Sequence, residues 1–253
     1  MDKRIAILGS GMIGGQTARL SVAAGYNTVI ANTRGPETLQ ELVNELGPLA
    51  HAATAEEAIQ AADLIVAAIP FAAYTHLSPE LLAGKTVIDT MNYYPECDGE
   101  MAEIETDVIS TSELVQRHLA RSHVVRAINN VDWVRLLTNA RPTGAADRSA
   151  LPVAGDDADA KRSTISFVEA IGYDVVDMGP LSESWRSEPT MPAYVMPYIG
   201  NIPADLTQAT ERGWFLANPG NVVSRDDLKA LLAKAVRHDR MFGSLAGLAG
   251  SRL

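Results

Sequence analysis

Three glycines near the start of the sequence have the spacing of a phosphate-binding turn. Gly9, Gly11 and Gly14 form the pattern G-x-G-x-x-G between a short apolar run and a stretch with helical spacing. In such a unit the first glycine permits a tight turn, the second lets the backbone approach a pyrophosphate, and the third lets the helix pack closely on the strand. Backbone N–H groups at the helix start can then bind the anion. The pattern predicts a dinucleotide site, and a turn without a ligand is the alternative.

The residues that follow the second expected strand indicate which dinucleotide is bound. An NAD site usually carries an acidic residue about 20 residues after the glycines, where it binds the ribose 2′-hydroxyl. No acidic residue lies between Asp2 and Glu37, and the strand ends in Asn32, Thr33 and Arg34. An arginine beside two small polar donors can bind a 2′-phosphate through charge-assisted hydrogen bonds. The sequence therefore favours NADP over NAD, and a solvated loop charge is the alternative for Arg34.

The residues just past the later strands predict where a second molecule would react. In open parallel sheets, ligands lie across the carboxyl ends of the strands. Those positions hold Pro70, Phe71, Asn92 and Asn129. This rim has no evident Lys or Glu general base and no Ser–His pair, so we assign no catalytic residue. Hydride transfer between two cofactor rings fits such a site, because the cofactors carry the chemistry and the protein orients them.

Other reactive residue types are scattered. Of five histidines only His76 falls close to a strand end, and none has metal-ligand spacing. Asp156, Asp157 and Asp159 stand at the start of an expected helix, where acids interact favourably with the helix dipole. The single cysteine, Cys97, cannot form an intrachain disulfide. We therefore expect no metal site.

An alternation of strand and helix patterns must position these residues. Several of the expected strands are fully apolar, as is typical of parallel strands buried on both faces. We expect strands at 5–8, 28–31, 64–69, 86–89, 124–128, 151–155 and 173–178, and helices at 12–24, 37–46, 54–61 and 158–171. This order predicts an α/β fold with a doubly wound, mainly parallel sheet. Residues 1–178 would form a Rossmann-type NADP-binding domain.

The character of the sequence changes after residue 178. Prolines cluster between positions 180 and 203, and no strand pattern continues. Residues 224–238 have the pattern of an amphipathic helix, with Ser224 and Asp227 as a capping pair. We expect residues 179–253 to be a smaller, mostly helical region that forms a dimer contact or covers the site. The glycine-rich tail after this helix would be mobile or pack against a partner.

Charge and hydropathy limit the class of partner. The 253 residues include 31 acidic and 21 basic side chains, a formal net charge of −10. That balance argues against general binding to nucleic acid or to an anionic membrane, both of which need a cationic surface. No apolar run approaches the roughly 20 residues of a membrane span, and the N-terminus does not resemble a signal peptide. We expect a cytoplasmic protein that acts on small molecules.

Five stretches of the sequence together resemble a known family. They are GSGMIG (9–14), ANTR (31–34), AIPF (68–71), VVRAINN (124–130) and the segment 153–189, which contains AGDD and DMGPLSESWRSEP. In these stretches the chain is similar to the coenzyme F420-dependent NADP oxidoreductases, which are themselves similar to the NADPH-binding domain of membrane metalloreductases. The resemblance spans roughly residues 3–190.

The resemblance implies an activity and several roles. The family transfers hydride reversibly between NADP(H) and the deazaflavin coenzyme F420, and its members form homodimers through the C-terminal region. By position, Ser10, Met12 and Ile13 would line the pyrophosphate turn. Ile69 and Pro70 would border the nicotinamide together with Phe71. Asn92 and Asn129 would lie near the two rings, and the residues at positions 32–34 would hold the 2′-phosphate.

Two other functions remain open. The chain could be an NADPH-dependent reductase of the same fold acting on a flavin, a quinone or a small carbonyl or imine. It could also be a non-catalytic NADP-binding sensor. An open groove for a tricyclic ring favours coenzyme F420, whereas a pocket closed by Tyr93, Tyr94 and Trp133 favours a small substrate.

Overall fold

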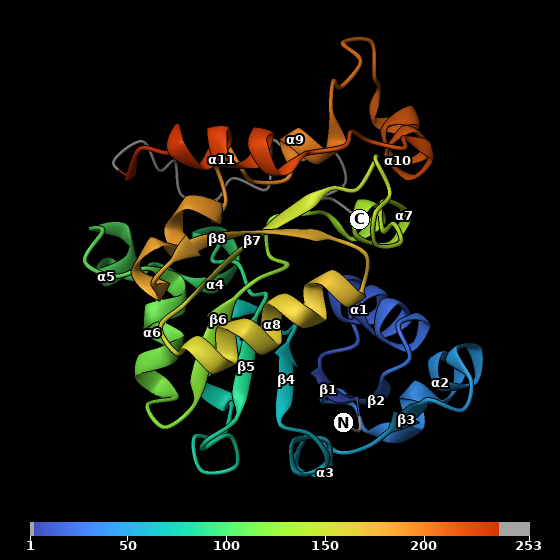
Figure 1. Ribbon diagram of the computed structural model, residues 1–253, viewed down its shortest axis with the longest axis vertical. Coiled ribbons are helices and arrows are strands. Elements are labelled where there is room, and N and C mark those ends of the chain that lie inside the picture. The colour runs from blue at the N-terminus through green and yellow to red at the C-terminus, as the bar shows by residue number, and fades with distance from the viewer. Residues whose placement is uncertain (1–2, 238–253) are drawn as a thin grey trace.

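The computed structural model describes residues 3–237 and builds them around one eight-stranded sheet (Figure 1). The strand order is β3-β2-β1-β4-β5-β6-β7-β8. The first six strands are parallel: β1 (Arg4–Leu8), β2 (Asn27–Ala31), β3 (Ala50–Ala52), β4 (Leu64–Ala67), β5 (Thr86–Asp89) and β6 (His123–Arg126). Strand order 3-2-1-4-5-6 is that of the Rossmann fold, so the predicted doubly wound α/β architecture is confirmed.

Helices cover both faces of the sheet. Side chains of β1 alternate, so that Ile5 and Ile7 enter one core while Ala6 and Leu8 enter the other. The helices of the first core are α1 (Met12–Ala23), α7 (Trp133–Thr138) and α8 (Ala158–Ala170), and those of the second are α3 (Ala55–Ala61) and α6 (Thr111–His118). Burial on both faces explains why the central strands are mostly apolar.

Side-chain caps fix where the helices begin. Thr54 and Glu57 form a reciprocal capping box at the start of α3, and Ser224 and Asp227 form another at the start of α11 (Arg225–Ala233). The predicted pair at Ser224 and Asp227 is thus confirmed. Asp157 caps α8 by accepting hydrogen bonds from two backbone N–H groups of its first turn. The acidic cluster at this position thus has a structural role.

The last two strands change direction. β7 (Ala150–Gly155) runs antiparallel to β6, and the only registered pairs are Val125 with Gly155 and Arg126 with Ala154. Most of β7 therefore extends past the carboxyl end of β6. β8 (Asp174–Gly179) then lies parallel to β7. The predicted extension of the sheet is confirmed, and it forms a wall beside the edge where the parallel strands end.

The remaining elements are short and mostly flank that edge. They are η1 (Pro36–Leu39), α2 (Gln40–Leu46), η2 (Phe71–His76), α4 (Pro95–Asp98), α5 (Ala102–Glu105), η3 (Leu181–Ser187), α9 (Met196–Ile199), α10 (Gln208–Ala217) and α11 (Arg225–Ala233). Figure 1 shows α9, α10 and α11 gathered at one end of the molecule. Leu228 and Leu232 of α11 pack into the same core as the sheet. A domain boundary at residue 178 remains a prediction.

Two strands end earlier than the sequence indicates. β4 ends at Ala67 instead of Ile69, since a residue before proline is restricted and Pro70 lacks an N–H group. β6 ends at Arg126 because Ile128 has a φ of +62°, which takes the chain out of the extended conformation. The edge strand β3 was not predicted, because three residues are too few to form a pattern.

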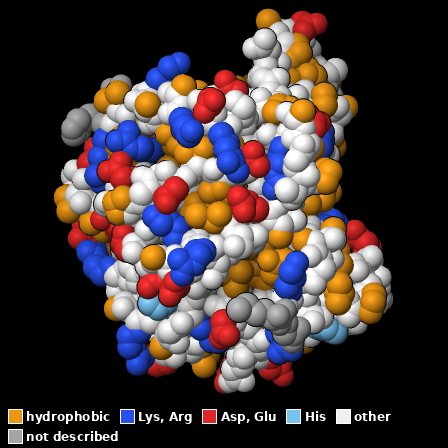
Figure 2. All heavy atoms as spheres, in the orientation of Figure 1, with side chains coloured by type: hydrophobic (Ala, Val, Ile, Leu, Met, Phe, Trp, Pro, Cys, Tyr) orange, Lys and Arg blue, Asp and Glu red, His pale blue; other side chains and the backbone are white. Residues whose placement is uncertain are grey.

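Two helix predictions also need correction. The helix expected at 37–46 is divided into a 3₁₀ turn and a short α-helix. The helix expected at 224–238 ends at Ala233, and His238 and the tail lie outside the described residues. Within residues 3–237 no helix is long and apolar enough to cross a membrane. Figure 2 shows acidic and basic side chains interspersed on one face of the molecule.

Candidate functional site

The glycine turn has the geometry that its spacing predicts. Gly9 has a φ of +107°, and a β-carbon there would collide with the carbonyl of Ala68. A β-carbon at Gly14 would collide with the carbonyl of Gly9. At Gly11, by contrast, no atom of another residue lies within 4 Å of the β-carbon position. The first and third glycines therefore serve the packing of the protein, whereas the second faces open space at the start of α1.

A cavity of about 470 Å³ adjoins this turn. Its walls include Ser10, Asn32, Thr33 and Arg34, all of which the sequence assigned to cofactor binding. His76, the one histidine expected close to a strand end, also lines this cavity. Among residues 3–237 no carboxylate forms an ion pair with Arg34, so its charge is available to an anionic ligand.

Asn32 connects the end of β2 to the glycine turn. Its side-chain nitrogen donates to the hydroxyls of Ser10 (3.1 Å) and Thr38 (3.0 Å). Its side-chain oxygen accepts from the backbone N–H of Arg34 (2.9 Å). Asn32 therefore shapes the loop that carries Arg34, and its amide is largely occupied by protein partners.

A second cavity of about 380 Å³ lies at the carboxyl ends of β4, β5 and β6. The structure brings the predicted residues of this region together at its walls: Met12, Ile13, Ile69, Pro70, Phe71, Asn92 and Asn129. The two cavities share Gly11, Ala68, Ile69 and Pro70. They therefore meet at the glycine turn, and Gly14 is the one predicted cofactor residue that lines neither cavity.

The second cavity has aromatic walls and acidic polar groups. Tyr94, Trp133, Tyr194 and Phe215 line it, together with the exposed Cys97. Tyr93, expected beside Tyr94, is buried elsewhere and donates its hydroxyl to the carbonyl of Gly99 (2.9 Å). Of the three aromatic residues that would close the pocket around a small substrate, Tyr94 and Trp133 line the cavity and Tyr93 does not, because neighbouring residues in this extended segment point to opposite sides.

Two carboxylates face this cavity, and no Lys or Arg of the described chain lines it. Asp98 accepts hydrogen bonds from the backbone N–H groups of Ala72 (2.9 Å) and Tyr94 (2.8 Å). It thereby joins the loops that follow β4 and β5. Asp132 caps α7, and burial raises the pKa of its carboxyl against the opposing effect of Arg135. The wall is thus neutral to acidic.

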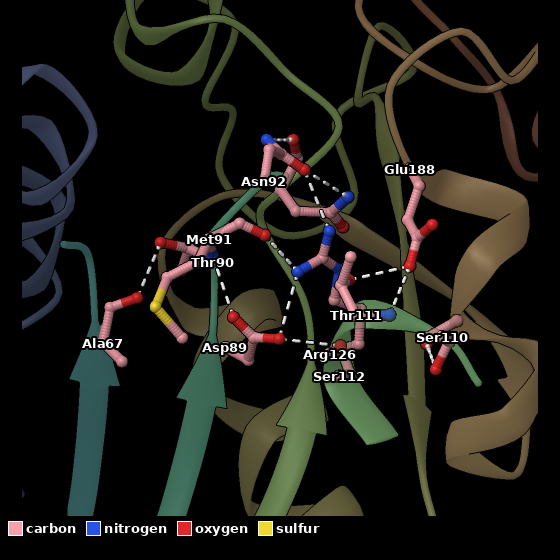
Figure 3. Close-up of polar contacts among 12 residues, drawn as sticks. Ala67, Asp89, Thr90, Met91, Asn92, Ser110, Thr111, Ser112, Arg126 and Glu188 are labelled. Atoms are coloured by element: carbon pink, nitrogen blue, oxygen red, sulfur yellow. Dashed lines mark hydrogen bonds and ion pairs between the residues drawn. The ribbon is translucent and has the colours of Figure 1, made fainter. Parts of the chain in front are cut away.

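A buried ion pair lies at the ends of β5 and β6 (Figure 3). Arg126 at the end of β6 and Asp89 at the end of β5 are 3.1 Å apart, and both side chains are fully buried. Ser112 donates its hydroxyl to Asp89 (2.7 Å), and Arg126 also donates to the carbonyl of Met91. Burial lowers the pKa of Arg126, whereas Asp89 opposes that effect.

The second guanidinium nitrogen of Arg126 holds Asn92. It donates to the Asn92 side-chain oxygen (2.9 Å), so the amide nitrogen of Asn92 points away and donates to the carbonyl of Asn129 (2.9 Å). Asn129 is 3% exposed, and its own amide donates to the carbonyl of Ser187 (2.6 Å). The two predicted asparagines thus connect the cavity wall to the C-terminal segment, which follows β8 and contains Ser187.

The C-terminal segment is anchored at the start of α6. Ser184 donates to the hydroxyl of Ser110 (2.9 Å), and the carboxylate of Glu188 accepts from the N–H (2.9 Å) and hydroxyl (2.7 Å) of Thr111 (Figure 3). Val195, which lines the cavity, has a φ of +47°, which is strained for a β-branched residue. These contacts fix the position of Tyr194.

Sequence reasoning missed Arg126, Asp89 and Tyr194 as parts of the site. Arg126 stands inside an otherwise apolar strand, and a charged residue in a fully buried strand could have indicated a buried partner. Tyr194 had no local signal, because it reaches the site only through contacts with residues about a hundred positions earlier.

The fold, with two joined cavities at the carboxyl edge of the sheet, is the fold of NAD(P)-dependent reductases. Residues 4–93 match the family of coenzyme F420-dependent NADP oxidoreductases. This match covers less than half of the chain, and over these residues the chain is similar to the family that its sequence resembles. The segment 153–189, which carried much of that resemblance, lies outside the match.

Two other proteins are similar to parts of this chain. The protein YjhV of Escherichia coli strain K12 is 41% identical over 56 residues, which are 22% of this chain and 41% of YjhV. A candidate F420-dependent NADP reductase from Arthrobacter sp. FB24 superposes with a TM-score of 0.60 at 28% identity, covering 71% of this chain and 86% of that one.

Two further solved structures share the fold alone. The hypothetical protein SMa0349 of Sinorhizobium meliloti has a TM-score of 0.67 at 23% identity, covering 78% of this chain and 94% of that one. An imine reductase from Pseudomonas sp. has a TM-score of 0.52 at 20% identity, covering 71% of this chain and 56% of that one.

Proposed function

We propose that the protein is an oxidoreductase that transfers hydride between NADP(H) and an acceptor in the second cavity. The observation that carries this proposal is the junction of the two cavities at Gly11 and Pro70. A dinucleotide whose pyrophosphate crosses the glycine turn has its adenosine end on one side and its nicotinamide on the other. Bound there, the nicotinamide supplies the hydride, and the chain orients it and excludes water.

The first cavity supports NADP over NAD. Arg34 lines it with Thr33, and no carboxylate stands at the end of β2 to bind a ribose 2′-hydroxyl. A guanidinium can form paired hydrogen bonds with a phosphate. We therefore propose that the residues at 32–34 hold the 2′-phosphate.

Coenzyme F420 is the acceptor that the family relationship supports. The match over residues 4–93 and the 28% identity with the Arthrobacter protein both point to it. In this proposal the deazaflavin ring lies between Phe71, Asn92 and Asn129, and its anionic tail leaves the cavity toward solvent.

A small imine or carbonyl compound is the acceptor that the cavity wall supports. Tyr94 and Trp133 line the cavity, together with Tyr194 and Phe215 from the C-terminal region. Asp98 and Asp132 give it an acidic character, which suits a neutral or cationic acceptor better than an anionic one. A flavin or a quinone would pack against the same aromatic side chains.

One experiment tests the function and separates the acceptors. Purified protein with NADPH is supplied in parallel with coenzyme F420 and with 1-pyrroline, a small cyclic imine, and NADPH oxidation is followed by absorbance. Turnover with F420 alone supports the family activity, and turnover with 1-pyrroline alone supports the small-substrate reductase. Tight NADPH binding without turnover in a wider panel of flavins, quinones and carbonyls would favour a non-catalytic sensor.

We also propose that the protein is cytoplasmic and that it forms the homodimer that the resemblance implies. Met196, Ile202 and Leu216 of the C-terminal region are between 36% and 42% exposed, and such side chains suit a contact between two copies. Light scattering of the purified protein would give the oligomeric state, and a monomer at micromolar concentration would contradict the proposal.

A further inference from the structure

Two tyrosine hydroxyls are hydrogen-bonded to each other at the wall of the second cavity. Tyr94 follows β5, and Tyr194 belongs to the C-terminal segment. Both residues line the cavity, and Tyr194 is the more deeply buried of the two. Neither tyrosine is used by the cofactor site, so the pair needs its own explanation.

The hydrogen bonds from Arg126 to Asn92 and from Asn92 to Tyr194 have a definite direction. A guanidinium can only donate, so Arg126 sets the Asn92 side chain with its oxygen toward Arg126 (2.9 Å). The Asn92 nitrogen then donates to the hydroxyl oxygen of Tyr194 (3.3 Å). Either hydroxyl can donate between the two tyrosines, and the bond from Asn92 favours the arrangement in which Tyr194 donates to the oxygen of Tyr94. In that arrangement the proton of Tyr94 is free to point into the cavity.

Resting on the proposed function, we infer that Tyr94 is the proton donor to the acceptor and that Tyr194 is the positioning residue behind it. The acceptor carbon receives the hydride and its electron pair from the reduced nicotinamide, which becomes oxidised. The π electrons of the acceptor double bond move to its heteroatom, which takes the proton of Tyr94. Tyr194 then returns a proton to Tyr94, and solvent reprotonates Tyr194.

The charges around the pair suit this role. Burial raises the pKa of both phenols, so each stays protonated at neutral pH. The hydrogen bond from Tyr194 and the charge of Arg126 act in the opposite sense on the pKa of Tyr94 and so stabilise its anion, whereas Asp98 and Cys97 oppose them. Tyr194 faces Arg126 and Asp132 in addition to Tyr94. A donor that is protonated at rest and stabilised as the anion is what general acid catalysis requires.

The activity test uses Tyr94→Phe, with Tyr93→Phe as the matched control. Tyr93 is the adjacent tyrosine, it also has a buried hydroxyl hydrogen bond, and it does not line the cavity. We expect Tyr94→Phe to lower kcat about 10²-fold with F420 or 1-pyrroline while the Kd for NADPH stays within about twofold. Tyr194→Phe combined with Tyr94→Phe is expected to be no slower than Tyr94→Phe alone, because the pair acts as one unit.

A second readout needs no cofactor. With ¹³C-labelled tyrosine, NMR titration of the protein alone follows each phenol, and Tyr194→Phe is expected to raise the pKa of Tyr94 because its donor is removed. A lowered or unchanged pKa of Tyr94 would overturn the inferred direction of the hydrogen bond from Tyr194 to Tyr94. Unchanged kcat in Tyr94→Phe would overturn the proton donor and leave the proposed function intact. Absence of turnover in the wild-type protein with all acceptors would overturn both.

Discussion

The carboxylate of Asp89 and the guanidinium of Arg126 lie 3.1 Å apart at the ends of neighbouring strands, and neither side chain is accessible to solvent. A buried ion pair rarely adds much net stability, because desolvation offsets the attraction. The position of this pair is more informative, since Arg126 also orients Asn92 at the cavity wall. We interpret the pair as fixing the position of Asn92 and thereby the shape of the cavity wall.

Removing one member of this pair should be costly. We expect Arg126→Met to lower the free energy of unfolding by about 3–5 kcal/mol, because Asp89 is left buried without its charge partner. Chemical denaturation measures this change. The control is Arg117→Met, which breaks an exposed pair with Glu103 and should cost no more than about 1 kcal/mol. Equal effects of the two variants would contradict this interpretation.

Substitutions in the glycine turn should separate an effect on NADPH binding from an effect on the stability of the fold. Gly11→Ala should weaken NADPH binding at least about tenfold, or about 1.4 kcal/mol, with little loss of stability, because the added carbon meets only the space reserved for ligand. Gly14→Ala should mainly destabilise the fold, because its carbon would collide with the carbonyl of Gly9. Calorimetric titration and thermal unfolding of both variants give the two quantities. Normal NADPH affinity in Gly11→Ala would place the pyrophosphate elsewhere.

Arg34 should determine the choice between the two dinucleotides. Arg34→Ala is expected to reduce NADPH affinity about tenfold or more and to change NADH affinity little, because only NADPH carries the 2′-phosphate. Arg19→Ala is the matched control, since Arg19 lies on α1, forms an ion pair with Glu45 (2.6 Å) and lines neither cavity. Fluorescence titration with both cofactors is the measurement. Equal wild-type affinities for NADPH and NADH would refute the assignment.

Asp98 should affect the acceptor more than the cofactor. Asp98→Ala removes the acceptor of two backbone N–H groups, at Ala72 and Tyr94, and so frees both loops at the second cavity. We expect KM for the acceptor to rise several-fold while the Kd for NADPH stays within about twofold of wild type. Glu96→Ala, on the exposed side of the same short helix, should change neither constant. A rise in the Kd for NADPH alone would show that Asp98 serves the first cavity.

Buried phenols should make the fold sensitive to alkaline pH. Burial is the largest cause that raises the pKa of Tyr26, Tyr93, Tyr94, Tyr173, Tyr194 and Tyr198. In the unfolded chain these phenols ionise near their ordinary pKa of about 10. Their contribution to stability is thus fully present below pH 10 and is lost as pH rises through the higher folded-state pKa values. Denaturation curves between about pH 8 and 11, with tyrosinate absorbance, test this, and stability that is constant over that range would contradict it.

The sheet was predictable because its signals are local. Apolar runs, the glycine turn and the capping pairs at Thr54 and Ser224 each need only a few neighbouring residues, and all appear in the structure. Strand direction after residue 150 was not predictable, because β7 contacts β6 through only two registered pairs. The hydrophobic pattern of a strand is the same whether the neighbouring strand runs parallel or antiparallel to it.

The first cavity was predictable for the same reason, since Ser10, Asn32, Thr33 and Arg34 follow two early strands. Their role in cofactor binding remains a prediction. The second cavity was predicted only on the side formed by the sheet. Its other side depends on Tyr194 and Phe215, which pack there through tertiary contacts alone. No pattern in residues 190–220 indicates which side chains face a ligand.

The hydrogen bond between Tyr94 and Tyr194 joins residues that are 100 positions apart in the chain. Contacts of such long range form late in folding, because the intervening loop must first be ordered. The parallel strands and the glycine turn lie within the first half of the sequence and can assemble earlier. During synthesis, all residues of the first cavity are therefore made well before Tyr194 and Phe215, which complete the lining of the second cavity. A chain interrupted in that interval would hold a reducing cofactor with no enclosed place for its acceptor.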